Sequence, residues 1–282
     1  MNRNFLSEIL AEKRQAVARL QCDSFAPGFR ERALEIRRNA APHCLLRALE
    51  ADLPRLKIIA EFKRRSPSAG IIRDDLSTGD VARHYERGGA SAISVLTDKD
   101  YFGGSIVDLS AIRSSTDLPV LRKDFIIDPI QIYEAAIARA DAILLIGAAL
   151  DDVSLGTLRK IAEEELGLDA LVEVHTSDEL RRASDAGAKI IGVNNRDLTT
   201  LRVSLNTSER LIAEAPSGSM MVSESGLQRA ESLRHLKSLG FRGFLIGEAL
   251  MRADDPETAL RDLIAAVRDQ QGAAISAGAR QS

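Results

Sequence analysis

The chain has 282 residues, 45% of them apolar and 28% charged, which is the balance of a globular protein large enough to bury a sizeable core. Its net charge of −3 excludes a general electrostatic attraction to nucleic acid or to an anionic membrane. The two cysteines, Cys22 and Cys44, are too few for a disulfide scaffold or a zinc cluster, and no apolar run is long enough to span a bilayer. We therefore expect a cytoplasmic protein.

Residues 1–48 have a helical pattern of their own. Apolar residues recur at helical spacing from Phe5 to Leu20, and two shorter helical stretches follow at 29–38 and 43–50. Because this segment is too short and too polar to hold a core, we expect it to form a helical extension that packs on a larger body.

From Leu56 onward, a short apolar run repeatedly precedes an amphipathic helical stretch. The runs are 57–61, 91–96, 119–121, 142–146, 170–174, 189–193, 220–223 and 243–247. This alternation indicates an α/β protein with a parallel sheet buried on both faces. Eight strand–helix units predict a (β/α)8 TIM barrel over residues 49–271. An open doubly wound sheet is the alternative, but the first run leads into the basic segment 63–68 instead of a Gly-rich turn.

The segment 272–282 is rich in Ala, Gly and Ser, and we expect it to be disordered.

Polar residues stand where most of the predicted strands end, and the active sites of such barrels lie at that end. Glu61 and Lys63 have the same parity on the first strand, so they face the same way. Lys123 and Glu173 stand on the third and fifth strands. Two lysines and two glutamates in one cleft can separate a proton donor from a proton acceptor. Salt bridges at the barrel rim are the structural alternative.

The loops after the seventh and eighth strands predict a phosphate site. They contain Ser225-Gly226 and Gly247-Glu248, and glycine lets an anion approach backbone N–H groups closely. Arg196, after the sixth strand, supplies a candidate charge-assisted contact.

Two further patterns are weaker. Arg64 and Arg65 are either a solvated charge run or helpers for an anionic substrate. Glu173 and His175 have a spacing that a metal site uses, but no third ligand is evident, so we predict no metal.

The ordered set of strand-end motifs resembles the indole-3-glycerol-phosphate synthase family. The resemblance is carried by AEFKRRSPS (60–68), LTD (96–98), YFGGS (101–105), LRKDF (121–125), LVEV (171–174), GVNNRDL (192–198), SESG (223–226) and LIG (245–247). It covers the whole barrel, and the helical extension fits it. It implies a lyase of tryptophan biosynthesis that needs neither cofactor nor metal. The implied substrate is 1-(2-carboxyphenylamino)-1-deoxyribulose 5-phosphate, which undergoes ring closure, decarboxylation and dehydration to indole-3-glycerol phosphate.

The resemblance also implies roles for individual residues. Lys123 is expected to be the general acid of ring closure, and Lys63 to bind the substrate carboxylate and donate a proton in dehydration. Glu173 is expected to act as general base or to stabilise positive charge, Glu61 to orient Lys63 or share the base role, and Asn194 to hold substrate hydroxyls. The expected substrate-binding residues are Arg196, Ser225, Gly226, Gly247, Ser66, Glu224, Phe102 and Phe125.

Two other functions stay open at this point. One is another phosphate-binding barrel enzyme, such as phosphoribosylanthranilate isomerase, whose family uses a Cys–Asp pair; here no Cys stands at a strand end. The other is a non-catalytic barrel that binds a phosphorylated metabolite, which the converging lysines and glutamates disfavour. In each case the partner is a phosphorylated small molecule, and we expect no binding to nucleic acid or membrane and a monomer or weak oligomer.

Overall fold

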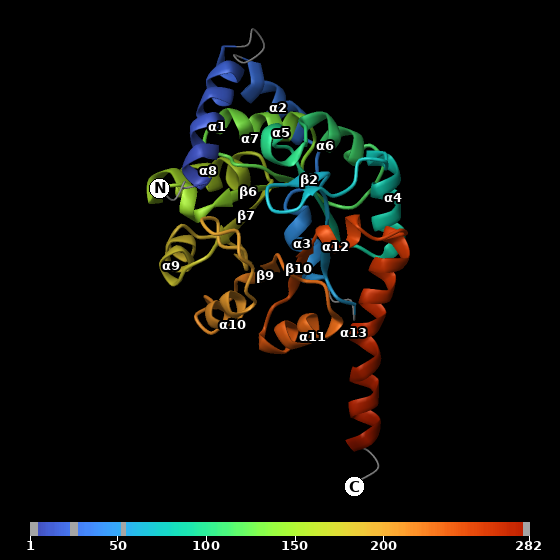
Figure 1. The fold of residues 1–282 in the computed structure, drawn as a ribbon. Helices are drawn as coiled ribbons and strands as arrows, with labels where there is room; N and C mark the ends of the chain where they lie inside the picture. The colour runs from blue at the N-terminus through green and yellow to red at the C-terminus, as the bar shows by residue number, and fades with distance from the viewer. Residues whose placement is uncertain (1–4, 23–27, 52–54, 279–282) are drawn as a thin grey trace.

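The structure is a computed structural model that describes residues 5–22, 28–51 and 55–278, with side chains described up to residue 267. Three helices form the predicted extension: α1 (Phe5–Gln21), α2 (Phe29–Arg37) and α3 (Cys44–Glu50). Helix α2 packs on α7 (Pro129–Ile137), and α1 lies beside the same helix (Figure 1). The extension is therefore docked on the barrel, as its sequence indicated, although its residues 1–4 and 23–27 lie outside the described residues.

Eight parallel strands close into a barrel, in the order β1, β4, β5, β6, β7, β8, β9 and β10, with β10 paired to β1. Their bounds are β1 (Ile58–Phe62), β4 (Ala92–Leu96), β5 (Val120–Lys123), β6 (Ala142–Ile146), β7 (Asp169–Val174), β8 (Ile190–Asn194), β9 (Met220–Glu224) and β10 (Gly243–Ile246). Each matches one predicted apolar run, so the prediction of a (β/α)8 barrel is confirmed. A small hairpin, β2 (Arg65–Ser66) and β3 (Gly70–Ile71), lies in the segment after β1.

Helices separate the strands and form the outer layer. They are α4 (Thr78–Gly88), α5 (Lys99–Phe102), α6 (Ile106–Arg113), α7, α8 (Asp152–Lys160), α9 (Ser177–Asp185), α10 (Asn206–Ile212), α11 (Ala230–Leu239), α12 (Glu248–Met251) and α13 (Pro256–Gly278). Helix α7 begins after the N-cap Asp128, with Pro129 as its first residue, and Gln131 completes the capping box. Within the described part of the chain, no helix has both the length and the apolar character that crossing a bilayer requires.

Helix α13 runs into the segment for which the sequence predicts disorder. Its bounds reach Gly278, no side chain is described beyond residue 267, and 279–282 lie outside the described residues, so the disorder expected for 272–282 stays a prediction. Alanine has the highest helix propensity of all residues, so the same Ala-rich composition that lacks core-forming side chains also permits a helix.

The core is arranged as two concentric layers. One hydrophobic cluster fills the space between strands and outer helices. The other fills the barrel interior and includes Ile59, Leu121 and Leu171. Leu45 and Leu49 of α3 belong to the same cluster, and α3 contacts β7 and β9. Because side chains alternate along a strand, the residues two positions further on, at the carboxyl ends, also face the interior.

Candidate active site

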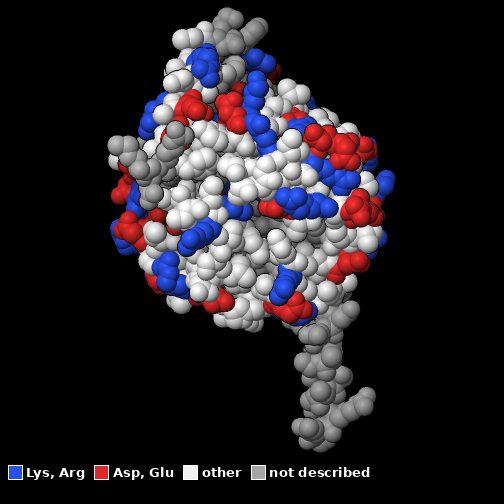
Figure 2. All heavy atoms as spheres, viewed as in Figure 1, with Lys and Arg blue, Asp and Glu red and all other residues white. Residues whose placement is uncertain are grey.

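All of the residues predicted for the site line one cavity at the carboxyl ends of the strands. Its volume is about 370 Å³, within the range of small-molecule sites. The lining includes Glu61, Lys63, Ser66, Phe102, Lys123, Phe125, Glu173, Asn194, Arg196, Glu224, Ser225, Gly226 and Gly247. Basic and acidic side chains are interspersed over the face seen in Figure 2, which shows no broad basic patch.

Lys123 is the centre of the charged part of the cavity. Its Nζ lies 3.2 Å from Oε2 of Glu173 and 3.4 Å from Oε2 of Glu224, while its side chain is 14% exposed. Burial alone would lower the pKa of Lys123, but Glu173, Glu224 and Glu61 outweigh it and raise that pKa above its ordinary value. The free site therefore holds Lys123 as an ammonium group, which is the form a general acid needs.

The two carboxylates beside Lys123 differ in their electrostatics. Burial opposes ionisation of Glu173, but Lys123, His175 and a hydrogen bond from Asn194 outweigh it and lower the pKa of Glu173. Burial raises the pKa of Glu224 to about 8; Glu173 and Glu61 add to this shift and Lys123 opposes it. One carboxylate is thus held ionised while its neighbour binds a proton near neutrality, which is the separation that proton-transfer chemistry uses.

Lys63 and Glu61 form a second ion pair at the end of β1. The Nζ–Oε1 distance is 2.8 Å, and the two side chains are 14% and 6% exposed. Their equal parity on the strand, read from the sequence, is what brings them together.

Two glycines make room for the carboxylates. A Cβ atom at Gly192 on β8 would overlap Oε1 of Glu224 and lie 3.2 Å from Leu171. A Cβ atom at Gly247 would overlap Oε1 of Glu61 and lie 3.0 Å from its Cβ. The sequence prediction assigned Gly247 to contact with the substrate phosphate and hydroxyls, and Gly192 to no role in the site.

The part of the cavity where the sequence predicts phosphate binding has an unusual backbone. Ser225 has a left-handed backbone with φ of 66°, and Gly226 follows with φ of 75°. Nη1 of Arg196 donates to Oγ of Ser68 and to the carbonyl of Leu201, each at 3.0 Å. Arg196 therefore links the segment after β1 to the segment after β8, across the mouth of the barrel.

The opposite wall is apolar. The rings of Phe102 and Phe125 are tilted with centroids 6.4 Å apart. Leu144 and Ile146 of β6 line the same cavity, although the sequence prediction placed no site residue on that strand. Strand parity could have identified Leu144 and Ile146, because side chains alternate along a strand and both face the barrel interior.

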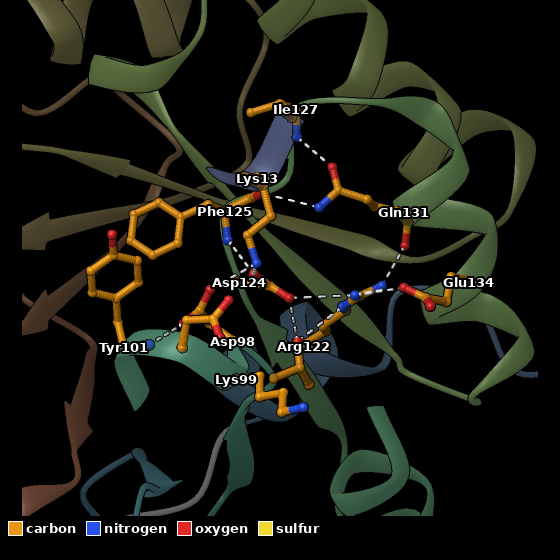
Figure 3. A network of polar contacts seen from close by, with 12 residues as sticks. Lys13, Asp98, Lys99, Tyr101, Arg122, Asp124, Phe125, Ile127, Gln131 and Glu134 are labelled. Atoms are coloured by element: carbon orange, nitrogen blue, oxygen red, sulfur yellow. Dashed lines mark hydrogen bonds and ion pairs between the residues drawn. The ribbon is translucent and has the colours of Figure 1, made fainter. Parts of the chain in front are cut away.

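Lys13 on α1 is a second residue that the sequence prediction missed. Its Nζ lies 2.8 Å from Oδ2 of Asp98 and 2.7 Å from Oδ1 of Asp124, and its side chain is 11% exposed (Figure 3). Asp124 stands between Lys123 and Phe125 in the chain, and Asp98 caps α5 by accepting from the backbone N–H of Tyr101. The extension is thus tied by charge to two segments that line the cavity.

Arg64 and Arg65, which the sequence left as either a solvated charge run or helpers for an anionic substrate, both contact other segments of the protein. Arg64 forms a bidentate pair with Asp108 at 2.7 and 2.8 Å, and Arg65 donates to backbone carbonyls of Lys99 and Asp100. Neither arginine lines the cavity, so both fasten the segment after β1 to α5 and α6. Among the described residues, no group of three His, Cys, Asp or Glu side chains is arranged to hold a metal ion.

Fold and cavity together define an acid–base enzyme built on a (β/α)8 barrel. The sequence profile described as indole-3-glycerol phosphate synthase matches residues 6–263. An indole-3-glycerol phosphate synthase of Carboxydothermus hydrogenoformans is 44% identical over 93% of this chain and 100% of its own. The protein of the same description from Chloroherpeton thalassium is 45% identical over 89% of this chain and 95% of its own. The chain belongs to the indole-3-glycerol phosphate synthase family.

The family, its carboxy-lyase activity and its place in tryptophan biosynthesis are thereby confirmed as predicted, and the isomerase and non-catalytic alternatives fall away. Among solved structures, thiamine phosphate pyrophosphorylase from Pyrococcus furiosus has a TM-score of 0.58 at 19% identity, covering 76% of this chain and 96% of that one. A 3-hexulose-6-phosphate synthase has a TM-score of 0.57 at 18% identity, covering 75% of this chain and 100% of that one. These likenesses show the barrel fold alone.

Proposed function

We propose that the cavity converts 1-(2-carboxyphenylamino)-1-deoxyribulose 5-phosphate to indole-3-glycerol phosphate, CO2 and water. The observation that carries this assignment is the Lys123 ammonium held between Glu173 and Glu224, in one cavity with the Lys63–Glu61 pair. The substrate has a carboxylate and a phosphate, and its conversion needs a proton donor and a proton acceptor. Both requirements are met within this set of side chains.

In the first step, Lys123 donates a proton to the substrate carbonyl oxygen while the ring carbon that bears the carboxylate attacks the carbonyl carbon. The new C–C bond closes the five-membered ring. CO2 then leaves, and the electron pair of the broken bond restores the aromatic ring. Lys63 binds the carboxylate until it leaves, because its ammonium lies at the cavity wall with only Glu61 as an ion-pair partner among the described residues.

In the second step, the hydroxyl on the former carbonyl carbon leaves as water and the adjacent CH2 group loses a proton. Lys63 protonates the departing hydroxyl. Glu173, held ionised, stabilises the positive charge that develops on the substrate nitrogen and accepts the proton. We assign Glu224 to this acid–base cluster, because its carboxylate lies 3.4 Å from Nζ of Lys123.

The remaining contacts follow from the chemistry of each wall. The phosphate is bound by backbone N–H groups at Ser225, Gly226 and Gly247, and Arg196 adds a charge at the same side. Ser66 and Asn194 bind the hydroxyls of the sugar chain. The aromatic ring of the substrate packs on Phe102 and Phe125, which line the apolar wall.

We also propose that the chain acts in the cytoplasm as a monomer or weak oligomer that binds neither nucleic acid nor membrane. The net charge of −3 and the free thiols of Cys22 and Cys44 support this proposal. Sedimentation velocity at micromolar concentration tests the oligomeric state, and a stable dimer would contradict it.

The direct test is to incubate the purified chain with the substrate and follow the indole fluorescence of the product, with chelator present. The chain has no Trp, so the background from the protein is low. Lys123→Ala is expected to lower kcat at least ~10²-fold, as for a lost general acid, with an unchanged circular dichroism spectrum. Lys189→Ala is the matched control, because Lys189 is exposed before β8 begins, at the opposite end of the barrel. Absence of product, or product only with added metal, would refute the assignment.

A further inference from the structure

His175 lies behind Glu173 and does not line the cavity. It directly follows the last residue of β7, and its side chain is 13% exposed. Its Nδ1 lies 3.2 Å from Oε2 of Glu179, and its Nε2 lies 3.5 Å from Oε1 of Glu173. One imidazole therefore bridges a carboxylate at the start of α9 and a carboxylate of the active site.

The contact with Glu179 fixes the proton on Nδ1. Oε2 of Glu179 also accepts from the backbone N–H of His175 at 2.8 Å, and its Oε1 accepts from Oγ1 of Thr176, the N-cap of α9, at 3.1 Å. Burial opposes ionisation of Glu179, but these contacts outweigh it and lower its pKa. Because an ionised carboxylate only accepts hydrogen bonds, Nδ1 must be the donor.

The other ring nitrogen then decides the charge of the imidazole. Nε2 has no hydrogen-bond partner among the described residues, and it faces Oε1 of Glu173. A lone pair on Nε2 would repel that carboxylate, whereas an N–H would attract it. Burial alone would lower the pKa of His175, but the hydrogen bond to Glu179 and the charge of Glu173 outweigh it and raise that pKa above 6.5.

The remaining charged groups near His175 come from three other elements. Glu224 at the end of β9 and Asp197 in the segment after β8 interact electrostatically with the imidazole, and both favour its charged form. Arg210 on α10 donates to the backbone carbonyl of His175 at 3.4 Å. The acidic side chains outnumber this one cation, so the surroundings stabilise the imidazolium.

We propose that His175 is a positioning residue that acts through Glu173: its imidazolium holds Oε1 of Glu173, so that Oε2 stays against Nζ of Lys123. The inference rests on the catalytic role proposed above for Glu173 and adds to it a group that titrates. His175 itself touches neither the substrate nor the reacting atoms. Loss of its proton removes the attraction at Oε1 and leaves Glu173 held by Lys123 and Asn194.

Two substitutions separate charge from packing. His175→Phe removes both ring nitrogens and with them the positive charge that faces Glu173. It is expected to lower kcat about tenfold at pH 7, the effect of losing one close charge contact in a partly buried site, with little change in KM. His175→Gln keeps an N–H near the Nε2 position and cannot titrate, so kcat should recover most of this loss. Its kcat should also lack the alkaline decline that begins in the wild type once pH exceeds the pKa of His175. Identical pH profiles of kcat in the wild type and His175→Gln would overturn the proposal.

His235→Phe is the matched control. His235 forms a 3.0 Å pair with Glu209 on the outer surface, so the variant removes a similar His–Glu contact remote from the cavity. It should keep the wild-type kcat and pH profile. A tenfold loss in this control would show that the loss in His175→Phe is not specific, and would overturn the assignment.

The interaction itself is tested without turnover, by following the imidazole ¹⁵N resonances of His175 against pH. In Glu173→Gln the pKa of His175 should fall, because the facing negative charge is gone. An unchanged pKa would overturn the inference whatever the kcat of the variant. Wild-type turnover in Glu173→Gln would instead overturn the proposed role of Glu173, and with it any effect of His175 on kcat. The titration of His175 would still show whether the two side chains interact.

Discussion

The Lys13 bridge gives the extension a measurable contribution to stability. In Lys13→Met the aliphatic stem remains, but the carboxylates of Asp98 and Asp124 lose the cation that lies 2.8 and 2.7 Å from them (Figure 3). Removing one partner of a buried ion pair costs about 3–5 kcal/mol, because the other charge stays buried and uncompensated. Asp124 keeps Arg122 at 3.4 Å and a hydrogen bond from Thr97 at 2.6 Å, so the loss should lie at the lower end, about 3 kcal/mol.

The loss is measured by guanidinium unfolding at pH 7, and it corresponds to a fall in Tm of roughly 6–12 °C for a domain of this size. Arg14→Met is the matched control, since Arg14 is exposed on the same helix and its change should stay within about 0.5 kcal/mol. Lys13→Met should also raise KM, because Asp124 sets the position of Phe125 by accepting its backbone N–H at 2.8 Å. A loss below about 1 kcal/mol, as for a surface pair, would refute the buried-bridge reasoning.

The same bridge predicts a pH dependence. Burial opposes ionisation of Asp124, but Lys13 and Arg122 outweigh it and lower its pKa. A lowered pKa contributes stability that is present above the unfolded value of ~3.9 and is lost as pH falls through the folded value. The gap in stability between wild type and Lys13→Met should therefore narrow as pH falls below about 4, and a gap that stays constant would contradict this assignment.

Two further predictions concern the cavity. Because burial raises the pKa of Glu224 to about 8 from 4.5, the folded wild type binds this proton more tightly than the unfolded chain and loses stability as pH rises between those values. The unfolding free energy of Glu224→Gln minus that of the wild type should therefore grow from pH 5 to pH 8 in denaturant titrations, and a constant difference would contradict the shift. Gly192→Ala should destabilise the fold by about 1–3 kcal/mol and lower kcat, because its Cβ would displace Glu224. The control Gly156→Ala, with open space around its Cβ on α8, should be neutral or stabilising in the same thermal and kinetic assays.

The fold was predictable because each strand is a short apolar run, and residues that begin or end helices mark the segments between the strands. Thr176 caps α9, and the left-handed Gly187 and Gly240 lie where α9 and α11 end. Period-two parity likewise predicts that Glu61 and Lys63 face the same way. The disorder expected for 272–282 stays a prediction although α13 runs to Gly278, because composition alone does not separate a helix without a core from an unfolded tail.

The rest of the site depends on closure of the barrel and on docking of the extension. Lys123 on β5 and Glu224 on β9 lie on strands that are not neighbours in the sheet, and only closure brings their side chains to 3.4 Å. Lys13 is one of several charged residues on α1, and nothing in its local pattern distinguishes it from Arg14. Its role depends on how the helix is rotated on the barrel, which the sequence of the helix does not determine.

Closure also explains why the carboxylates titrate differently. Ile59, Leu121 and Leu171 form an apolar layer in the barrel, and Glu61, Lys123 and Glu173 stand two residues further along the same strands. The apolar layer excludes water from beneath the charged one, so every unpaired charge there is costly. Lys123 and Lys63 bring two positive charges to three carboxylates, and burial raises the pKa of one of them, Glu224, to about 8.

The substrate brings a carboxylate and a phosphate into this layer and so adds further negative charge. Substrate binding should therefore raise the pKa of Glu224 and draw a proton into the site. Proton uptake on binding of an unreactive dianionic substrate analogue to the wild type, and its reduction in Glu224→Gln, would be measured by calorimetry in buffers of different ionisation enthalpy. Equal uptake in both proteins would contradict the idea that the apolar layer sets the protonation of this carboxylate.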